Sequence, residues 1–397
     1  MKTAGAEYRP LSNSTRLWLA SDRVCPPCVN QPMYEGTGRF DVKRWQEAVR
    51  VASEANRGSR IVLRGMYGSE KWIDSGITPA VREVDGSDWD GLHSEGAPYL
   101  HTSFPVRKGP NAEVVLIQGD PARVAFRSHH AIMDGRGTMT WAEDVFRVLR
   151  GEKPLGAEFI MTENDLLNVQ WGKRKKSLPH TYIPLAGNAD GDDTRPVWRR
   201  KTLPGKHPRL LARVMLLTAR EARRHGNGNV RIGIPVDLRY RREGLRSTSN
   251  LANAIYIDIK PDAGVEQLAE EIDRRVTNLY DGEITWEDKI ARFIPIWLLR
   301  IGIEMEGSRN QKSGHYRFSG FISNLGRVDV EKFSCDEFKC RTFYAVPLIA
   351  PMVPFMMTLS GANDRSEIMI NMPGNMTTNG RLETALDNIV KGLDTTQ

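Results

Sequence analysis

The stretch that decides the fold is Ser128-His129-His130-Ala131-Ile132-Met133-Asp134-Gly135-Arg136-Gly137. Residues 124–130 alternate with a period of two, which predicts a strand that carries its last two residues, both histidines, on opposite faces. A second apolar run lies at 114–117, and the Gly-Asp-Pro sequence at 119–121 is typical of a turn. The sequence therefore predicts a hairpin that ends at the histidine pair.

A helix is predicted directly after this stretch. Apolar residues recur at helical spacing between 141 and 149, with Thr138 as candidate N-cap and Gly151 as the end. Gly135 and Gly137 are expected to allow positive φ angles and a close approach of another backbone. A sharp strand-to-helix turn of this kind would expose the last histidine of the strand to a substrate.

His130 and Asp134 supply groups suited to acid–base chemistry. A neutral imidazole can take a proton from an attacking hydroxyl or amine. Asp134 would either orient the imidazole ring or anchor the turn through an arginine elsewhere. A buried histidine pair at a strand end is the alternative interpretation. The combination of two histidines, an acid and a glycine at this spacing, in a strand–turn–helix context, favours catalysis.

His129-His130-x-x-x-Asp134-Gly135 resembles the HHxxxDG signature of the thioester-dependent acyltransferase superfamily. Its members include chloramphenicol acetyltransferase, alcohol and polyketide-associated acyltransferases, and nonribosomal-peptide condensation domains. The resemblance implies an α/β fold of two chloramphenicol-acetyltransferase-like lobes, each a mixed sheet flanked by helices, with the active-site tunnel between them. It also implies that His130 is the general base and that His129 packs and hydrogen-bonds to support the site.

Two further segments resemble motifs of this superfamily in the same order along the chain. Residues 11–19 are similar to its first motif. Pro235-Val236-Asp237-Leu238-Arg239 is similar to its P-V-D-L-R segment, with 249–253 as the asparagine-containing turn that follows. The comparison suggests an ion pair between Arg239 and Asp134, which would make the acid structural because its carboxylate would be engaged by the guanidinium. Arg16 is the rival partner, and a solvent-facing Arg239 is the alternative.

Residues 323–328, Ser-Asn-Leu-Gly-Arg-Val, resemble a segment of the alcohol-acyltransferase and polyketide-associated branches. The resemblance implies that Ser323, Asn324, Gly326 and Arg327 form a loop that shapes the tunnel and supports the lobe interface far from the catalytic base. Arg327 is a candidate for binding an anionic donor group, but a structural role is preferred.

Candidates for stabilising a tetrahedral oxyanion lie in two places. The backbone N–H of Gly135 stands at the active-site turn. Thr358 and Ser360 lie on a strand that could offer a hydroxyl, as a strand residue does in some relatives of this superfamily.

The chain of 397 residues is long enough for two lobes, each with its own core. The HHxxxDG motif places an N-terminal lobe at 1–176. Residues 177–200 are predicted to be a linker because Pro, Gly and Asp cluster there, and 201–397 to be the C-terminal lobe. Further elements are predicted as a helix capped at Asp41, a strand at 60–64, helices at 208–226, 265–279 and 382–393, and a hairpin across 355–371.

The composition of 40% hydrophobic and 26% charged residues is that of a soluble globular protein, and no membrane segment or secretory signal is expected. The net charge of +7 suggests nucleic-acid binding as one hypothesis. The basic run at 173–176, however, is short and has no interleaved aromatic residues. We expect a solvated loop there, with a docking patch for an acidic carrier protein or coenzyme A as the second interpretation.

Four cysteines form two close pairs, Cys25 with Cys28 and Cys335 with Cys340. Such spacing is typical of the cysteine ligands of a structural zinc site. The second pair is loosely spaced and no histidine pattern completes it, so free thiols in a reducing cytoplasm and no bound metal are expected.

The function expected is acyl transfer from acyl-CoA or an acyl-carrier protein to a small-molecule hydroxyl or amine acceptor, within natural-product biosynthesis. The donor thioester is a substrate, and no permanently bound cofactor is expected. A monomeric, cytoplasmic enzyme is predicted. The alternatives are a free-standing nonribosomal-peptide-type condensation enzyme that forms an amide between carrier-bound and amine substrates, and a non-catalytic docking relative.

Overall fold

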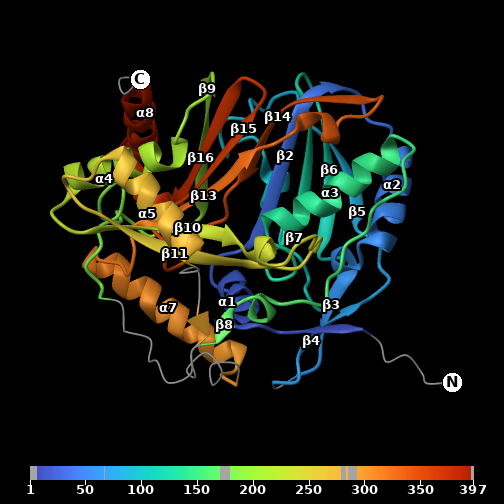
Figure 1. Cartoon of the computed structure of the whole chain (residues 1–397), viewed down its shortest axis with the longest axis horizontal. Coiled ribbons are helices and arrows are strands. Elements are labelled where there is room, and N and C mark those ends of the chain that lie inside the picture. The colour runs from blue at the N-terminus through green and yellow to red at the C-terminus, as the bar shows by residue number, and fades with distance from the viewer. Residues whose placement is uncertain (1–6, 67, 170–178, 279–282, 285–292, 395–397) are drawn as a thin grey trace.

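The computed structural model describes residues 7–66, 68–169, 179–278, 283–284 and 293–394, and its elements form two halves that lie side by side (Figure 1). The first half of the chain contains α1 (Asn13–Asp22), α2 (Val42–Ala55) and α3 (Gly135–Leu149), with β1 (Tyr8–Pro10), β2 (Val29–Gly38), β3 (Ile61–Arg64), β4 (Lys71–Asp74), β5 (Ala80–Asp85), β6 (Ala112–Gln118), β7 (Ala122–His129) and β8 (Asn168–Val169). The second half contains α4 (Leu210–His225), α5 (Val265–Thr277), α7 (Ile296–Ser313) and α8 (Arg381–Asp394), with β9 (Pro196–Pro204), β10 (Val230–Asp237), β11 (Ala252–Ile259), β12 (Glu283–Ile284), β13 (Gly320–Arg327), β14 (Phe338–Val346), β15 (Met356–Ala362) and β16 (Arg365–Pro373).

Each half is built on one mixed sheet. The first sheet has the strand order β14-β2-β7-β6-β5, in which only β5 and β6 are parallel neighbours. The second has the order β11-β10-β13-β15-β16-β9, with parallel pairing on both sides of β13. Helices α2 and α3 lie beside the first sheet, and α4, α5 and α8 beside the second (Figure 1). The predicted fold of two mixed sheets flanked by helices is confirmed.

The period-two pattern of β7 sorts its side chains between two cores. Phe126 packs in the core formed with the helices, where it meets Trp141 edge to face at 5.3 Å. Ala125 points the other way, into a core that also contains Trp198 of β9 and Met369 of β16. Because that second core joins residues of both halves, burial of apolar surface holds the two sheets together.

Strand β14 lies in the first sheet, whereas the predicted domain boundaries assign its residues to the C-terminal lobe. It comes from the second half of the chain, yet it pairs with β2 over Phe338–Val346 and forms the edge of the first sheet. The predicted C-terminal lobe at 201–397 is therefore not self-contained. The predicted linker at 177–200 also contains the start of β9, which forms an edge of the second sheet. An alternating sequence pattern predicts that a segment forms a strand, but it does not predict with which sheet the strand pairs.

A buried charge cluster fastens the two sheets near this crossover. Arg200 of β9 donates to both oxygens of Glu35 on β2, at 3.0 and 3.1 Å. It donates equally to Glu367 on β16, at 2.9 and 3.0 Å. Thr342 of β14 adds a hydrogen bond of 3.0 Å to Glu367. Polar groups removed from water in this way are stable only when every partner is present, so the cluster fixes the relative position of the sheets.

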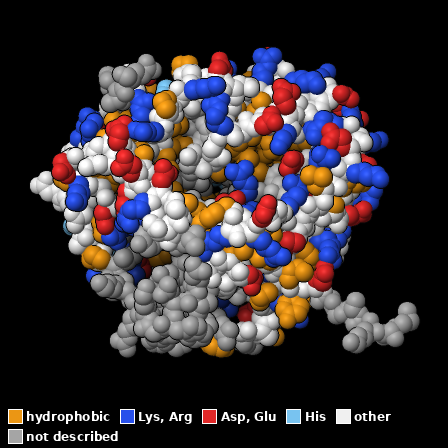
Figure 2. All heavy atoms as spheres, viewed as in Figure 1, with side chains coloured by type: hydrophobic (Ala, Val, Ile, Leu, Met, Phe, Trp, Pro, Cys, Tyr) orange, Lys and Arg blue, Asp and Glu red, His pale blue; other side chains and the backbone are white. Residues whose placement is uncertain are grey.

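Charged side chains of both signs are interspersed over the face of the molecule in view, which is hollowed between the two halves (Figure 2). The basic run at 173–176 lies outside the described residues. Among the helices that the structure describes, none has the length and apolar character needed to cross a membrane.

Candidate active site

His130 lies in the turn just after β7, and its surroundings hold it tightly. Its backbone N–H donates to the carbonyl of Cys28 at 2.9 Å, and Asn250 donates its side-chain N–H to the His130 carbonyl at 3.0 Å. The imidazole stacks on Trp18 of α1 with ring centroids 4.2 Å apart. Burial lowers the pKa of His130 to about 4, against the smaller raising effect of a hydrogen bond with its own backbone and of the Asp134 charge. The ring is therefore unprotonated at neutral pH.

His129 is the last residue of β7 and is fully buried. Its Nδ1 accepts a hydrogen bond of 3.0 Å from the Ala131 backbone N–H, and its Nε2 lies 3.5 Å from a carboxylate oxygen of Asp22. Burial raises the pKa of Asp22, but the opposing effects of His129 and of the Cys28 N–H hold it below its usual range. These contacts fix the turn on the side away from His130.

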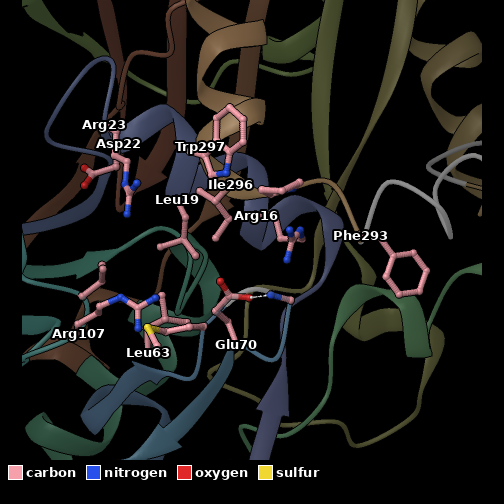
Figure 3. Close-up of a pocket in the computed structure, with 14 residues that line it drawn as sticks. Arg16, Leu19, Asp22, Arg23, Leu63, Glu70, Arg107, Phe293, Ile296 and Trp297 are labelled. Atoms are coloured by element: carbon pink, nitrogen blue, oxygen red, sulfur yellow. Dashed lines mark hydrogen bonds between the residues drawn. The ribbon is translucent and has the colours of Figure 1, made fainter.

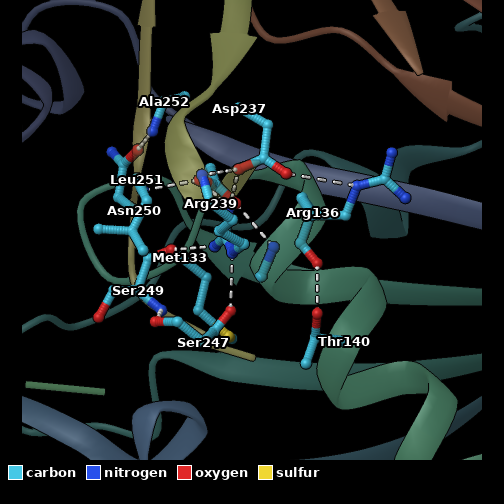
Figure 4. A network of polar contacts seen from close by, with 12 residues as sticks. Met133, Arg136, Thr140, Asp237, Arg239, Ser247, Ser249, Asn250, Leu251 and Ala252 are labelled. Carbon is cyan, nitrogen blue, oxygen red and sulfur yellow. Dashed lines mark hydrogen bonds and ion pairs between the residues drawn. The ribbon is translucent and has the colours of Figure 1, made fainter. Parts of the chain in front are cut away.

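Arg239, from the second half of the chain, lies within a network of polar contacts (Figure 4). It engages both carboxylate oxygens of Asp134. The two N–H···O distances are 3.0 and 3.1 Å. The backbone N–H groups of Gly137 and Leu251 add bonds of 2.6 and 2.7 Å. Burial raises the pKa of this carboxyl, but Arg239 and the two N–H groups hold it below its ordinary value. The ion pair suggested by the sequence is present, whereas the rival Arg16 donates to the carbonyl of Ile294.

Helix α3 starts differently from the prediction. Asp134 is its N-cap, and Thr138 lies one turn inside, where its hydroxyl donates to the Asp134 carbonyl at 2.9 Å. Neither Gly135 nor Gly137 has a positive φ, but Gly151 does, at 77°, so the predicted helix end is confirmed. What requires a glycine at 137 is a close approach, since a Cβ there would lie 2.4 Å from the Thr248 carbonyl oxygen. The positive φ angles expected for this turn are absent, whereas the expected close approach of another backbone is present at Gly137.

The two glycines make a matched pair for mutation. We expect Gly137→Ala to lower the free energy of unfolding by about 1–3 kcal/mol, because its new methyl group would meet backbone of the other half. Gly135→Ala should cost little, since the nearest atom to a Cβ there is a Leu325 methyl at 3.9 Å. Chemical denaturation of both variants checks this, and equal stability of the two would contradict the proposed contact.

The His130 ring opens on a cavity of about 150 Å³ lined by both halves of the chain. Its walls include Gly135 and Met139 from α3, and Asp237 and Ser323 from β10 and β13. A lining drawn from both halves agrees with the tunnel that the sequence resemblance implied.

The segment at 323–328 is close to the base rather than far from it. Ser323 and Asn324 line the same cavity as His130, because β13 runs parallel to β10 and ends at the same edge of the sheet. Gly326 adopts a φ of 71° and donates its N–H to Asn324 at 3.1 Å. Arg327 is not part of the cavity wall and donates to the carbonyl of Asn363, which agrees with a structural role.

The two candidate oxyanion hydroxyls already have acceptors. Thr358 lines the cavity, but its hydroxyl donates to the Ala345 carbonyl at 2.5 Å. Ser360 is buried, is not part of the lining and donates to the Phe343 carbonyl at 2.8 Å. Both bonds reach β14 and bridge the two sheets. Gly135, in contrast, is the first residue of α3 and lines the cavity, where helix N–H groups favour negative charge.

Three residues that hold the histidine pair were given no role from the sequence: Trp18, Asn250 and Asp22. Trp18 and Asn250 lie within the quoted motif segments, so their position in the motifs was a usable signal. Asp22 carries no such signal, because its partner His129 is distant in the sequence.

The four cysteines are free thiols. Among the described residues, no three His, Cys, Asp or Glu side chains are grouped as a metal site requires. Burial raises the pKa of the Cys25 thiol to about 11, which favours its protonated form at neutral pH.

No protein-family model and no curated protein matches the sequence significantly. Solved structures do match. They include the condensation domain of the Monacolin K polyketide synthase MokA (TM-score 0.65, 13% identity, 98% of this chain and 97% of that chain). The starter condensation domain of rhizomide synthetase RzmA, a mutant in complex with C8-CoA and Leu-SNAC, has a TM-score of 0.66 at 15% identity over 98% and 94% of the two chains. The first condensation domain of the calcium-dependent antibiotic synthetase, in complex with a substrate analogue, has a TM-score of 0.67 at 14% identity over 97% and 95%.

These structures align over nearly the full length of both chains, although few residues are identical. The agreement therefore concerns the arrangement of both sheets and not one local motif. The chain therefore has the fold of these condensation domains.

Proposed function

We propose that this protein is a condensation-type acyltransferase that moves an acyl group from a thioester donor to a hydroxyl or amine acceptor in natural-product biosynthesis. The observation that carries the proposal is the unprotonated His130 ring on a cavity lined by both halves. The donor is acyl-CoA or an acyl-carrier protein. One of the similar structures holds C8-CoA together with Leu-SNAC, which supports thioester substrates for this fold.

His130 acts as the general base in this mechanism. The Asn250 side-chain nitrogen lies 3.4 Å from Nδ1 of the ring, so we assign proton transfer to Nε2. Nε2 takes the proton of the acceptor as the acceptor oxygen or nitrogen attacks the thioester carbonyl carbon. The carbonyl becomes a tetrahedral oxyanion, which the Gly135 N–H at the start of α3 stabilises. The oxyanion collapses, the C–S bond breaks, and the imidazolium returns its proton to the leaving thiolate.

Asp134 positions this machinery and takes no proton. Its oxygens are occupied by Arg239 and by two backbone N–H groups, so it serves to fix the turn between β7 and α3. Because Arg239 lies in the second half of the chain, the pair also holds the two walls of the cavity in register.

The fall of kcat/KM on the acid side of the pH profile should occur at an unusually low pH. Protonation removes the lone pair that His130 needs, and a pKa of about 4 moves this loss below the ordinary histidine range. With an alcohol acceptor, kcat/KM should stay level from neutral pH down to about pH 5 and then fall about tenfold per unit below the pKa. Initial rates across buffers of constant ionic strength test this, and an acid limb centred near an ordinary histidine pKa would contradict it.

A free-standing condensation enzyme that forms an amide between a carrier-bound acyl group and an amine is the second candidate. The similarity to condensation domains of synthetases favours it. A non-catalytic docking relative fits less well, because the motif and its cross-lobe ion pair are both intact.

The decisive experiment supplies the same acyl group on coenzyme A and on a carrier protein, against a panel of amines and alcohols, with product mass analysis and His130→Ala as control. Turnover from coenzyme A would identify a tailoring or ester-forming acyltransferase. Turnover from the carrier protein alone would identify the condensation enzyme. If neither donor is used, acyl transfer is refuted and the docking relative is favoured.

A further inference from the structure

A second cavity, of about 360 Å³, lies against helix α1 (Figure 3). Arg16, Leu19 and Arg23 follow one another at helical spacing and line it, while Trp18 between them faces the opposite way and stacks on His130. The same helix therefore forms a wall of this cavity and a support of the catalytic base. Asp22 links the two as well, since it lines the cavity and faces His129.

Arg16 is the notable group in this cavity. Its side chain is 4% exposed, and its Nη2 donates to the carbonyl of Ile294. Its Nε has no hydrogen-bond partner, and Glu70, whose charge acts on this guanidinium, forms no ion pair with it among the described residues. A buried guanidinium normally has an anionic partner, because an unpaired charge away from water is costly. The free donor capacity of Arg16 thus points to an anion supplied from outside the protein.

The remaining charges leave the cavity with an excess of positive groups. Arg23 and Arg107 also line it, whereas its carboxylates are Asp22 and Glu70. Asp22 is engaged by a backbone N–H at 2.8 Å and by its contact with His129. Glu70 accepts a backbone N–H at 2.8 Å. Among the described residues neither carboxylate forms an ion pair with a guanidinium of the cavity, although the charge of Glu70 acts on Arg16 and that of Arg23 on Asp22. Arg107 donates to the Gly65 carbonyl at 2.8 Å.

The rest of the wall is apolar. Leu19 and Leu63 face the cavity from α1 and β3, and Ile296 and Trp297 from the start of α7 (Figure 3). Its volume is within the range of small-molecule sites, which combine apolar walls with a few placed polar groups. Such a lining suits an organic molecule with an anionic group better than a free inorganic ion.

We propose that this cavity binds an anionic group of one of the substrates, with Arg16 as the principal contact. The group is either a carboxylate on the acceptor or the phosphate of the pantetheine arm of the donor, both of which a guanidinium binds through paired N–H donors. The inference rests on the proposed function only in assigning the anion to a substrate of acyl transfer.

Isothermal titration with two matched probe pairs tests the site without turnover. One pair is leucine and leucinamide, which differ by the carboxylate charge, and the other is 4′-phosphopantetheine and pantetheine. In one of these pairs the probe that carries the carboxylate or phosphate should bind at least about tenfold more tightly than the probe that lacks it, and this gap in affinity should close in Arg16→Gln. The pair that shows the gap identifies which substrate carries the anion.

Arg220→Gln, at an exposed position of α4, is the matched control and should keep the gap. Where Arg16→Gln fails to fold, Arg107→Gln replaces it, since that side chain lines the same cavity but is exposed, and a loss of at least about threefold in selectivity is expected. Equal affinity within both probe pairs would overturn the proposal. So would a difference in affinity that persists in these variants. Selective binding without acyl transfer would count against the proposed function alone, and acyl transfer without selective binding against the anion site alone.

Discussion

Replacing His130 by alanine is expected to lower kcat/KM by about two to four orders of magnitude, the contribution of general-base assistance. The ring lines the cavity from the turn after β7, and its lowered pKa of about 4 leaves it unprotonated at neutral pH. The fold should survive, because the backbone bonds of this turn to Cys28 and Asn250 do not involve the ring. Steady-state kinetics together with a thermal melt measure both effects.

His207→Ala provides the control for loss of an imidazole. His207 is partly exposed, and its ring hydrogen-bonds only to the carbonyl of Pro204 among the described residues, so turnover should be unchanged. If a folded His130→Ala variant turned over at a near-normal rate, His130 would not be the base and the mechanism would have to be abandoned.

Asp134→Ala should lower the free energy of unfolding by about 3–5 kcal/mol, the usual cost of breaking a buried ion pair from one side. Arg239 would keep its charge and lose both carboxylate oxygens, while the N–H groups of Gly137 and Leu251 would lose their acceptor. Turnover should fall as well, because the turn that carries His130 would loosen. Urea denaturation and kinetics on the same preparation separate the two effects.

Glu54→Ala is the matched comparison, since Glu54 forms an exposed ion pair with Arg50 on α2. Such surface pairs contribute at most about 1 kcal/mol. Combining Asp134→Ala with Arg239→Leu should recover part of the lost stability, because the unpaired charge is then removed. An unchanged melting temperature in Asp134→Ala would refute the structural role and make a catalytic role for this carboxylate the better explanation.

The local elements of the fold could be predicted because each follows from a short pattern. The alternation at 124–130 became β7, Asp41 caps α2 as expected, and the hairpin across 355–371 became β15 and β16. The ion pair between Asp134 and Arg239 followed from the motif resemblance, although the residues are far apart in sequence.

What the sequence could not predict are contacts set by the packing of distant segments. The glycine at 137 is required by the carbonyl of Thr248, which no local pattern indicates. Trp18 and Asn250 were visible within motifs, but their contacts with His130 depend on how α1 and the segment after β10 meet the turn. The hydroxyls of Thr358 and Ser360 were predicted as oxyanion donors, but they donate to carbonyls of β14 instead. The sequence did not indicate these bonds, because the sheet to which β14 belongs was not predicted.

The crossing of β14 has a consequence for how the protein is made. On the ribosome, the first sheet cannot be completed until residue 346 has been synthesised, long after its other strands have emerged. Until then the β2 edge lacks its partner, and an open strand edge readily pairs with other chains. A fragment cut between the two halves would therefore tend to self-associate, and the halves are better produced together than apart.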